Sequence, residues 1–239
     1  MAEFEAPTAV TTQNNSSEDL QKLIAINTDN FVHSKVYKDY QNRYVEYLAE
    51  FKKNPLVHEI NEQLWPRLTG HTLVGPTKIA FRSPSTYIID PTFLDTAANV
   101  VPSEDQYQKL RNSSYTFFYL GEDLTGHAGI VHGGLLATIL DEITCRLAFL
   151  NFPSKKGVTA SLNISYKKPC FSNNYILLRC DVVKRTGRKC WVKGLVFQVD
   201  SEKHYDQKDV EKLENLLTEC DILVIEPRWV DEIKNKVDH

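Results

Sequence analysis

The fold of this chain is decided by the segment GHAGIVHGGLLATILDE, which spans residues 126–142. Gly133 and Gly134 open an expected helix that continues to about Leu150. Apolar side chains occupy most sides of this helix, and a helix without a broad polar face is usually buried. They are Leu135, Leu136, Ile139, Leu140, Ile143 and Leu147, with Ala137, Cys145 and Ala148 between them. The segment therefore predicts one long helix in the core of its domain.

Strand patterns stand on both sides of the predicted helix. Residues 158–167 alternate between an apolar set that begins at Val158 and a polar set that contains Thr159 and Asn163, which is typical of a half-buried strand. Further strands are expected at residues 115–120, 175–186, 190–199 and 218–226, with a hairpin turn at 187–188. This order predicts an α+β protein of the hotdog type, in which an antiparallel sheet wraps one long buried helix.

The rest of the chain is expected to surround this domain. Residues 1–16 are small and polar and predict a disordered tail. Residues 17–110 predict an N-terminal extension, helical at first and irregular from about residue 63, in which tyrosines three and four positions apart form a packing face. The hotdog domain itself is expected at 111–230, with residues 201–216 as an inserted polar helix.

The bulk composition excludes several classes of function. With 42% apolar and 25% charged residues, the chain has the composition of a globular protein, and its formal net charge of −3 does not favour nucleic acid. No apolar run approaches the about 20 residues that span a bilayer. Five cysteines without a CxxC pair predict unpaired, mostly buried thiols in a reduced compartment. The acidic, arginine-free start predicts no targeting segment, so we expect a cytoplasmic or mitochondrial protein.

Two linked motifs carry a resemblance to a known family. The segment GHAGIVHGGLLATILDE, followed by VTASLNISYKKP at residues 158–169, resembles the PaaI-type hotdog thioesterases and, more closely, their animal mitochondrial relatives. The shared features are the His-Gly-Gly helix start, an Asp nine residues after that His, and a T-A-x-L-N-I-x-Y-K-x-P strand. The resemblance covers about residues 115–226. It implies hydrolysis of acyl-CoA thioesters by a homodimer or a dimer of dimers, without a cofactor.

The start of the predicted helix is a candidate anion and carbonyl site. Helix N-termini expose N–H groups that have no acceptor inside the helix, and glycine lets a ligand approach them closely. The resemblance implies that the Gly133 N–H polarises the thioester carbonyl and that His132 helps to orient it. Alternatively, the two glycines allow tight packing and His132 caps the helix. Gly126 departs from the Asn that many PaaI-type enzymes carry, although the animal mitochondrial relatives also have Gly there, and the adjacent His127 is a candidate substitute.

Asp141 is the candidate catalytic acid, because an acid within an apolar helix needs water, a partner or a reacting group. The resemblance assigns it the role of base or nucleophile, whereas a structural carboxylate paired with Arg146, Lys167 or a backbone group is the alternative. Glu142 points about 100° away around the helix, so the two acids cannot serve one site. Gly133 and Asp141 are separated by roughly 12 Å along the helix, which an Asp side chain cannot span. If both act on one thioester, they come from two copies of the chain.

Polar and basic residues of the strands complete the expected site. The resemblance gives Thr159 the role of an active-site hydroxyl, with an ordinary strand threonine as the alternative. Basic residues gather at strand ends and suit the phosphates of coenzyme A, although a solvated hairpin rim explains them equally well. The expected catalytic set is Asp141, Gly133, His132 and Thr159, and the expected substrate-binding set is Gly134, His127, Asn163, Lys167, Lys168 and Arg188.

Two other functions remain open on the sequence. The separation of His127 and Asp141 resembles the dyad of hotdog acyl-thioester dehydratases, although those enzymes usually carry Glu as the acid and a Pro-Gly turn where this chain has His-Gly-Gly. A non-catalytic acyl-CoA-binding subunit is the third possibility. We expect no metal site, because no cysteine or acid accompanies the two histidines. The chain also lacks GxSxG, Walker and GxGxxG motifs.

Overall fold

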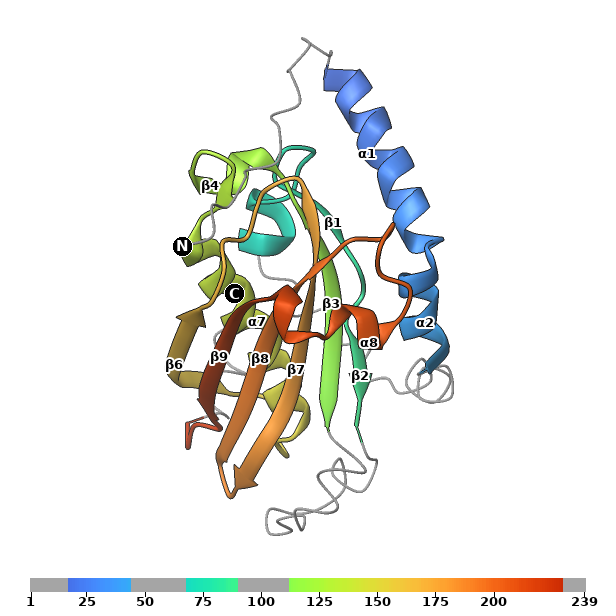
Figure 1. The fold of residues 1–239 in the computed structure, drawn as a ribbon. Coiled ribbons are helices and arrows are strands. Elements are labelled where there is room, and N and C mark those ends of the chain that lie inside the picture. The colour runs from blue at the N-terminus through green and yellow to red at the C-terminus, as the bar shows by residue number, and fades with distance from the viewer. Residues whose placement is uncertain (1–16, 44–67, 90–111, 230–239) are drawn as a thin grey trace, which may run out of the picture.

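A computed structural model describes residues 17–43, 68–89 and 112–229 of the chain. Its central feature is an antiparallel sheet of seven strands with one long helix, α7, against one face (Figure 1). The sheet order is β1-β3-β7-β8-β9-β6, and β2 pairs with β3. The strands are β1 (Ile79–Arg82), β2 (Thr86–Ile88), β3 (Ser113–Leu120), β6 (Val158–Tyr166), β7 (Asn174–Thr186), β8 (Lys189–Val199) and β9 (Leu216–Ile225). This arrangement confirms the predicted α+β hotdog fold.

Helix α7 (Gly133–Leu150) is held by its apolar side chains. Leu140 and Ile143 are fully buried and belong to one cluster with Leu178 of β7 and Val192 of β8. Burying such a side chain contributes about 1.5–3 kcal/mol, so the predicted helix is fixed by the core rather than by its own propensity. The helix also approaches β8 closely, because a Cβ on Gly194 would lie 2.9 Å from Leu140 Cδ2.

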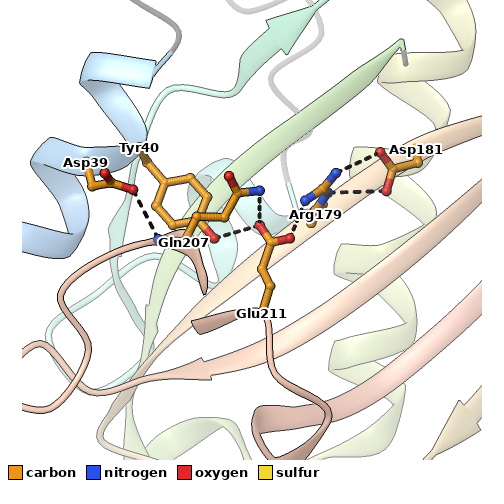
Figure 2. Close-up of polar contacts among 6 residues, drawn as sticks. All are labelled: Asp39, Tyr40, Arg179, Asp181, Gln207 and Glu211. Atoms are coloured by element: carbon orange, nitrogen blue, oxygen red, sulfur yellow. Dashed lines mark hydrogen bonds and ion pairs between the residues drawn. The ribbon is translucent and has the colours of Figure 1, made fainter. Parts of the chain in front are cut away.

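The outer face of the sheet is partly covered by the N-terminal extension. Helices α1 (Ser17–Val32) and α2 (Lys35–Arg43) contribute Phe31 and Tyr40 to a second buried cluster that includes Phe117 of β3. This confirms a packing role for Tyr40, whereas Tyr44 and Tyr47 lie outside the described residues. A polar network reinforces the contact (Figure 2): Tyr40 donates to Glu211 Oε1 at 2.7 Å, and Glu211 pairs with Arg179 of β7.

Two segments differ from the sequence prediction. The expected irregular region 63–110 contains β1 and β2, which pair with β3, because tertiary pairing overrides the local proline and turn signals. The expected helix at 201–216 is wrong: only α8 (Gln207–Val210) and the turn η3 (Leu213–Asn215) form there. The Asn215 side chain donates to the carbonyls of Asp209 and Val210, which ends α8 after one turn.

A β-bulge changes which face of β6 carries Thr159. The pairing with β9 shifts between Thr159 and Ser161, so Thr159 pairs with Val224 while Leu162 pairs with Ile222. Both partners in β9 belong to the core cluster beside α7. Thr159 therefore shares the inner face with Leu162, and its predicted place on the polar face beside Asn163 is wrong. One extra residue in a strand reverses the direction of the side chains that precede it.

Candidate active site

A pocket of about 510 Å³ opens at the N-terminus of α7. Its walls come from the helix tip, from the end of β6 and from the loop that carries β4 (Thr125–His127) and β5 (Ile130–Val131). The pocket unites five of the predicted site residues, His127, His132, Gly133, Lys167 and Lys168. The other lining residues are Gly126, Ile130, Val131, Leu136, Tyr166, Pro169 and Cys170.

His132 caps the helix, as one of the two sequence interpretations proposed. Its Nδ1 accepts a hydrogen bond from the Gly134 N–H at 2.9 Å, and its carbonyl accepts from Leu135 at 2.9 Å. In a neutral ring with Nδ1 as acceptor, the proton lies on Nε2. Within the described residues, the Gly133 N–H has no acceptor. The helix tip therefore offers two donors, the Gly133 N–H and the His132 Nε2–H.

Two glycines leave room for this capping ring. A Cβ on Gly126 would lie 2.8 Å from His132 Cδ2, and a Cβ on Gly134 would lie 2.8 Å from His132 Cε1. Both distances are shorter than a carbon–carbon contact allows. Gly126, where many PaaI-type enzymes carry Asn, is thus required by the position that the His132 ring takes in this chain.

Tyr166 is a pocket residue that the sequence analysis missed. Its hydroxyl donates to the Gly133 carbonyl at 2.8 Å, and its ring lies 3.3 Å from where a Gly133 Cβ would stand. It lies at the end of β6 on the same face as Leu162 and Ile164. The alternation of apolar and polar residues along this strand already indicated that its ring faces the helix. The hydrogen bond ties the edge strand to the first turn of α7.

Asp141 lies on the side of α7 that faces β6, outside this pocket. Thr159 donates to Asp141 Oδ1 at 2.6 Å, and the Cys145 thiol lies 3.8 Å from the same oxygen. Asp141 is partly buried, and it forms no ion pair with any cation among the residues the structure describes. The interpretation of Asp141 as a carboxylate paired with Arg146 or Lys167 is therefore not borne out within the chain.

Glu142 occupies the opposite environment. It pairs with Arg82 of β1 and with Arg146 of α7, each at 2.9 Å, and Thr69 of the helical turn η1 (Leu68–Thr72) donates to its other oxygen. Burial lowers the pKa of Arg146, and the Glu142 charge acts in the opposite direction. Glu142 is thus a structural acid that fastens the strap 68–82 to the helix.

The remaining predicted residues are divided by the structure. Lys167 pairs with Glu219 at 2.8 Å, and the Lys168 ammonium donates to the Glu214 carbonyl, so both lysines stand at the pocket with partners. Arg188 lies in the β7–β8 turn, where it donates to the Glu226 carbonyl at 3.0 Å. Asn163 is exposed on the outer face of β6. Within one chain, neither Arg188 nor Asn163 lines the pocket.

Part of the chain matches a known protein family. The family described as the thioesterase superfamily matches residues 128–203, a stretch that contains the helix tip, Asp141 and Thr159. This segment belongs to the thioesterase superfamily. The match ends within the loop that follows β8, so it omits β9 and the N-terminal extension.

Relatives of this thioesterase segment include proteins with and without an assigned activity. An uncharacterized mitochondrial protein of Candida albicans is 33% identical over 114 residues, which is 48% of each chain. The acyl-coenzyme A thioesterase THEM4 of Mus musculus is 34% identical over 103 residues, 42% of this chain and 43% of that one. The solved thioesterase superfamily member 2 of Mus musculus has 15% identity and a TM-score of 0.43, covering 70% of this chain and 95% of that one. The chain spans about half the length of the curated relatives it matches.

The described residues also bear on metal binding and on insertion into a membrane. No group of three His, Cys, Asp or Glu side chains in these ranges is placed to hold a metal ion. None of the helices in the same ranges has the length and apolarity needed to cross a bilayer. The five cysteines are all free and buried, which confirms the predicted unpaired thiols.

Proposed function

We propose that this chain hydrolyses acyl-CoA thioesters and that each active site is completed by two copies of the chain. The observation that carries the proposal is the open Gly133 N–H in a pocket at the tip of a helix whose acid, Asp141, lies two turns away. The membership of residues 128–203 in the thioesterase superfamily supports the same class of reaction.

In the proposed reaction, the Gly133 N–H and the His132 Nε2–H hold the carbonyl oxygen of the thioester, where negative charge develops. Asp141 of the second copy takes a proton from water, whose oxygen forms a bond to the carbonyl carbon. The carbon–sulfur bond then breaks, and the thiolate of coenzyme A receives a proton to give free thiol and carboxylic acid. Lys167 and Lys168 at the pocket wall suit the phosphates of the coenzyme.

Asp141 also has the alternative role of nucleophile, in which its oxygen bonds to the acyl carbon and water later cleaves the anhydride. A single turnover in ¹⁸O-labelled water separates these roles. If Asp141 is the nucleophile and water attacks the Asp141 carbonyl carbon of the anhydride, the first product carries an unlabelled Asp141 oxygen and ¹⁸O stays in the Asp141 carboxylate until the next turnover. A general base places the label directly in the first product.

The edge of the sheet supports pairing of two copies. β6 is the edge strand of the sheet, and most of its residues are exposed. The exposed residues include the apolar side chains of Val158, Ala160 and Tyr166. An unpaired strand edge with exposed apolar side chains is a template for association. Pairing along β6 would also cover Asp141, which faces this edge through Thr159. The proposed assembly is therefore a homodimer, and its localisation is mitochondrial, as the names of two fungal relatives suggest.

The test of the helix tip is Gly133→Pro. Gly133 is the first residue of α7, where proline removes the N–H, and the extended His132 backbone (φ −60°, ψ 127°) is compatible with a following proline. The Cβ that proline adds 3.3 Å from the Tyr166 ring is also present in Gly133→Ala, so the pair isolates the loss of the N–H. We expect turnover to fall by about 10²-fold, whereas Gly133→Ala retains the N–H and most of the activity. Release of free thiol from acyl-CoA esters of increasing length measures both. Equal activity of Gly133→Pro and Gly133→Ala would contradict the proposed carbonyl site.

The test of the shared site mixes two inactive variants. A dimer of Gly133→Pro and Asp141→Ala chains contains one intact tip facing one intact acid, so we expect about half of the wild-type activity per mixed dimer. If each chain held a complete site, the mixture would remain inactive. Hydration of an enoyl-CoA is measured in parallel, and hydration without thioester cleavage would favour a dehydratase instead. Tight binding of the CoA ester without either reaction would favour a binding subunit.

A further inference from the structure

Cys145 stands in the middle of the proposed acid site, one helical turn after Asp141. Its Sγ lies 3.1 Å from Thr159 Oγ1, and Thr159 Oγ1 lies 2.6 Å from Asp141 Oδ1. The direct distance from Cys145 Sγ to Asp141 Oδ1 is longer, 3.8 Å. The three side chains thus form a chain of contacts, thiol to hydroxyl to carboxylate, between α7 and the bulged start of β6.

The direction of these hydrogen bonds follows from the number of protons. A threonine hydroxyl has one proton and can also accept, whereas an ionised carboxylate only accepts. The Thr159 proton therefore belongs to the short bond with Asp141, and the Thr159 oxygen is left to accept from Cys145. Burial raises the pKa of the Cys145 thiol to about 12, so the sulfur keeps its proton at neutral pH and acts as the donor.

We propose that Cys145 is a positioning residue: its S–H donates to Thr159 Oγ1 and so directs the Thr159 hydroxyl proton at Asp141 Oδ1. Because Oδ1 is held in this way, the second carboxylate oxygen remains to act on water or on the acyl carbon. The proposal rests on the proposed thioester hydrolysis at Asp141. It also changes the expected role of Thr159, whose proton is used by the acid and is not offered to substrate.

The variants Cys145→Ala and Cys145→Ser separate the hydrogen bond from the packing. We expect Cys145→Ala to lower kcat by about fivefold with an unchanged KM, which is the size expected for one lost hydrogen bond. Cys145→Ser keeps a donor and should restore kcat to within about twofold of wild type. Cys180→Ala is the matched control, because Cys180 is a fully buried thiol of the same core cluster and should leave kcat unchanged.

A coupling measurement distinguishes positioning from a merely structural role. In a Thr159→Val background the relay is already broken, so Cys145→Ala should have no further effect on kcat. A structural role would instead lower kcat by the same factor in both backgrounds. The infrared S–H stretch gives a signature that does not depend on turnover: the Cys145 band, isolated as the difference between wild type and Cys145→Ala, should move to higher frequency in Thr159→Val.

The outcomes separate this inference from the proposed function. If the wild type cleaves thioesters and Asp141→Ala does not, but Cys145→Ala keeps full kcat, the role of Cys145 is wrong and the proposed function stands. Equal losses in Cys145→Ser and Cys145→Ala would also overturn it, as would an unshifted S–H band in Thr159→Val. If the wild type cleaves no acyl-CoA thioester, the proposed function is wrong, and the positioning role of Cys145, which depends on it, is wrong as well.

Discussion

The two sides of helix α7 treat two adjacent acids in opposite ways. Asp141 faces the edge strand β6, and Glu142 faces the strap formed by η1 and β1. Each acid accepts a hydrogen bond from a threonine, Thr159 for Asp141 and Thr69 for Glu142. Among the described residues, arginines pair with Glu142 and not with Asp141. The comparison shows that buried arginines compensate the charge of Glu142. Asp141 has no such partner in the part of the chain that the structure describes and lies beside the sheet edge, and it is therefore the acid that we propose for the chemistry.

The strongest way to break this comparison is to neutralise Glu142. Glu142→Gln leaves Arg82 and Arg146 without the carboxylate that they share. We therefore expect the free energy of unfolding, measured by chemical denaturation, to fall by about 3 kcal/mol. The activity of each folded molecule should be retained. If Glu142→Gln were as stable as wild type but inactive, the assignment of the two acids would have to be exchanged.

Asp141→Asn is the matched variant on the other side of the helix. We expect kcat to fall by about 10²-fold or more, while the denaturation midpoint stays close to that of wild type. The charge is lost without a cation being left behind, which is why stability should be little affected. Thiol release and chemical denaturation measured on the same preparation test both statements. Full activity in this variant would remove Asp141 from the mechanism.

The two threonines sharpen the comparison with a smaller effect. Thr159→Val and Thr69→Val remove one hydroxyl each and preserve side-chain shape. We expect Thr159→Val to lower kcat by about tenfold with little change in stability, because the carboxylate of Asp141 is no longer oriented. Thr69→Val should lower stability by about 1 kcal/mol and leave kcat unchanged. The same effect of both variants on kcat would show that the two sides are not functionally distinct.

The smallest expected effect concerns thiol chemistry. Burial raises the pKa of Cys145, Cys170 and Cys190 to about 12 each. Because the thiolate is the reactive form, iodoacetamide at pH 8 should modify the native protein very slowly and the unfolded protein at all five cysteines. Mass spectrometry after a timed reaction measures this. Rapid modification of native Cys145 would mean that the acid side of α7 opens readily to solvent.

Local patterns were sufficient for the parts of this fold that bury a regular apolar surface. The helix at Gly133 and the hairpin at Gly187 were predicted because their periodicity and turn residues point to one structure. The prediction of a helix at 201–216 was wrong because the apolar pattern there is weak. The Asn215 side chain bonds to the last carbonyls of α8 and ends that helix early. β1 was missed because its strand-forming residues make only a short run between Pro76 and Pro84, and the pairing with β3 is what decides the strand.

The candidate site was predictable as a set of residues but not as an arrangement. His132, Gly133 and Asp141 follow from the motif, and the separation of the last two along one helix predicts that, if both act on one thioester, they come from two copies of the chain. Tyr166 stands in the strand motif, but nothing in the motif indicates its hydrogen bond to the helix tip, and Cys145 fits an ordinary apolar position of the helix. The place of Thr159 beside Asp141 depends on a bulge in β6, which alternation of side chains alone predicts in the wrong direction.

The sequence by itself determined the buried helix, its glycine-rich start and the acid within it, because these depend on spacing along one element. Only the tertiary structure decided that Glu142 pairs with arginines and that the Thr159 hydroxyl bonds to Asp141. It also decided that the His132 ring caps the helix tip. The physical reason is that hydrogen bonds and ion pairs between elements depend on register and approach. One inserted residue in a strand, or one strap across a helix, changes these contacts while leaving every local pattern intact.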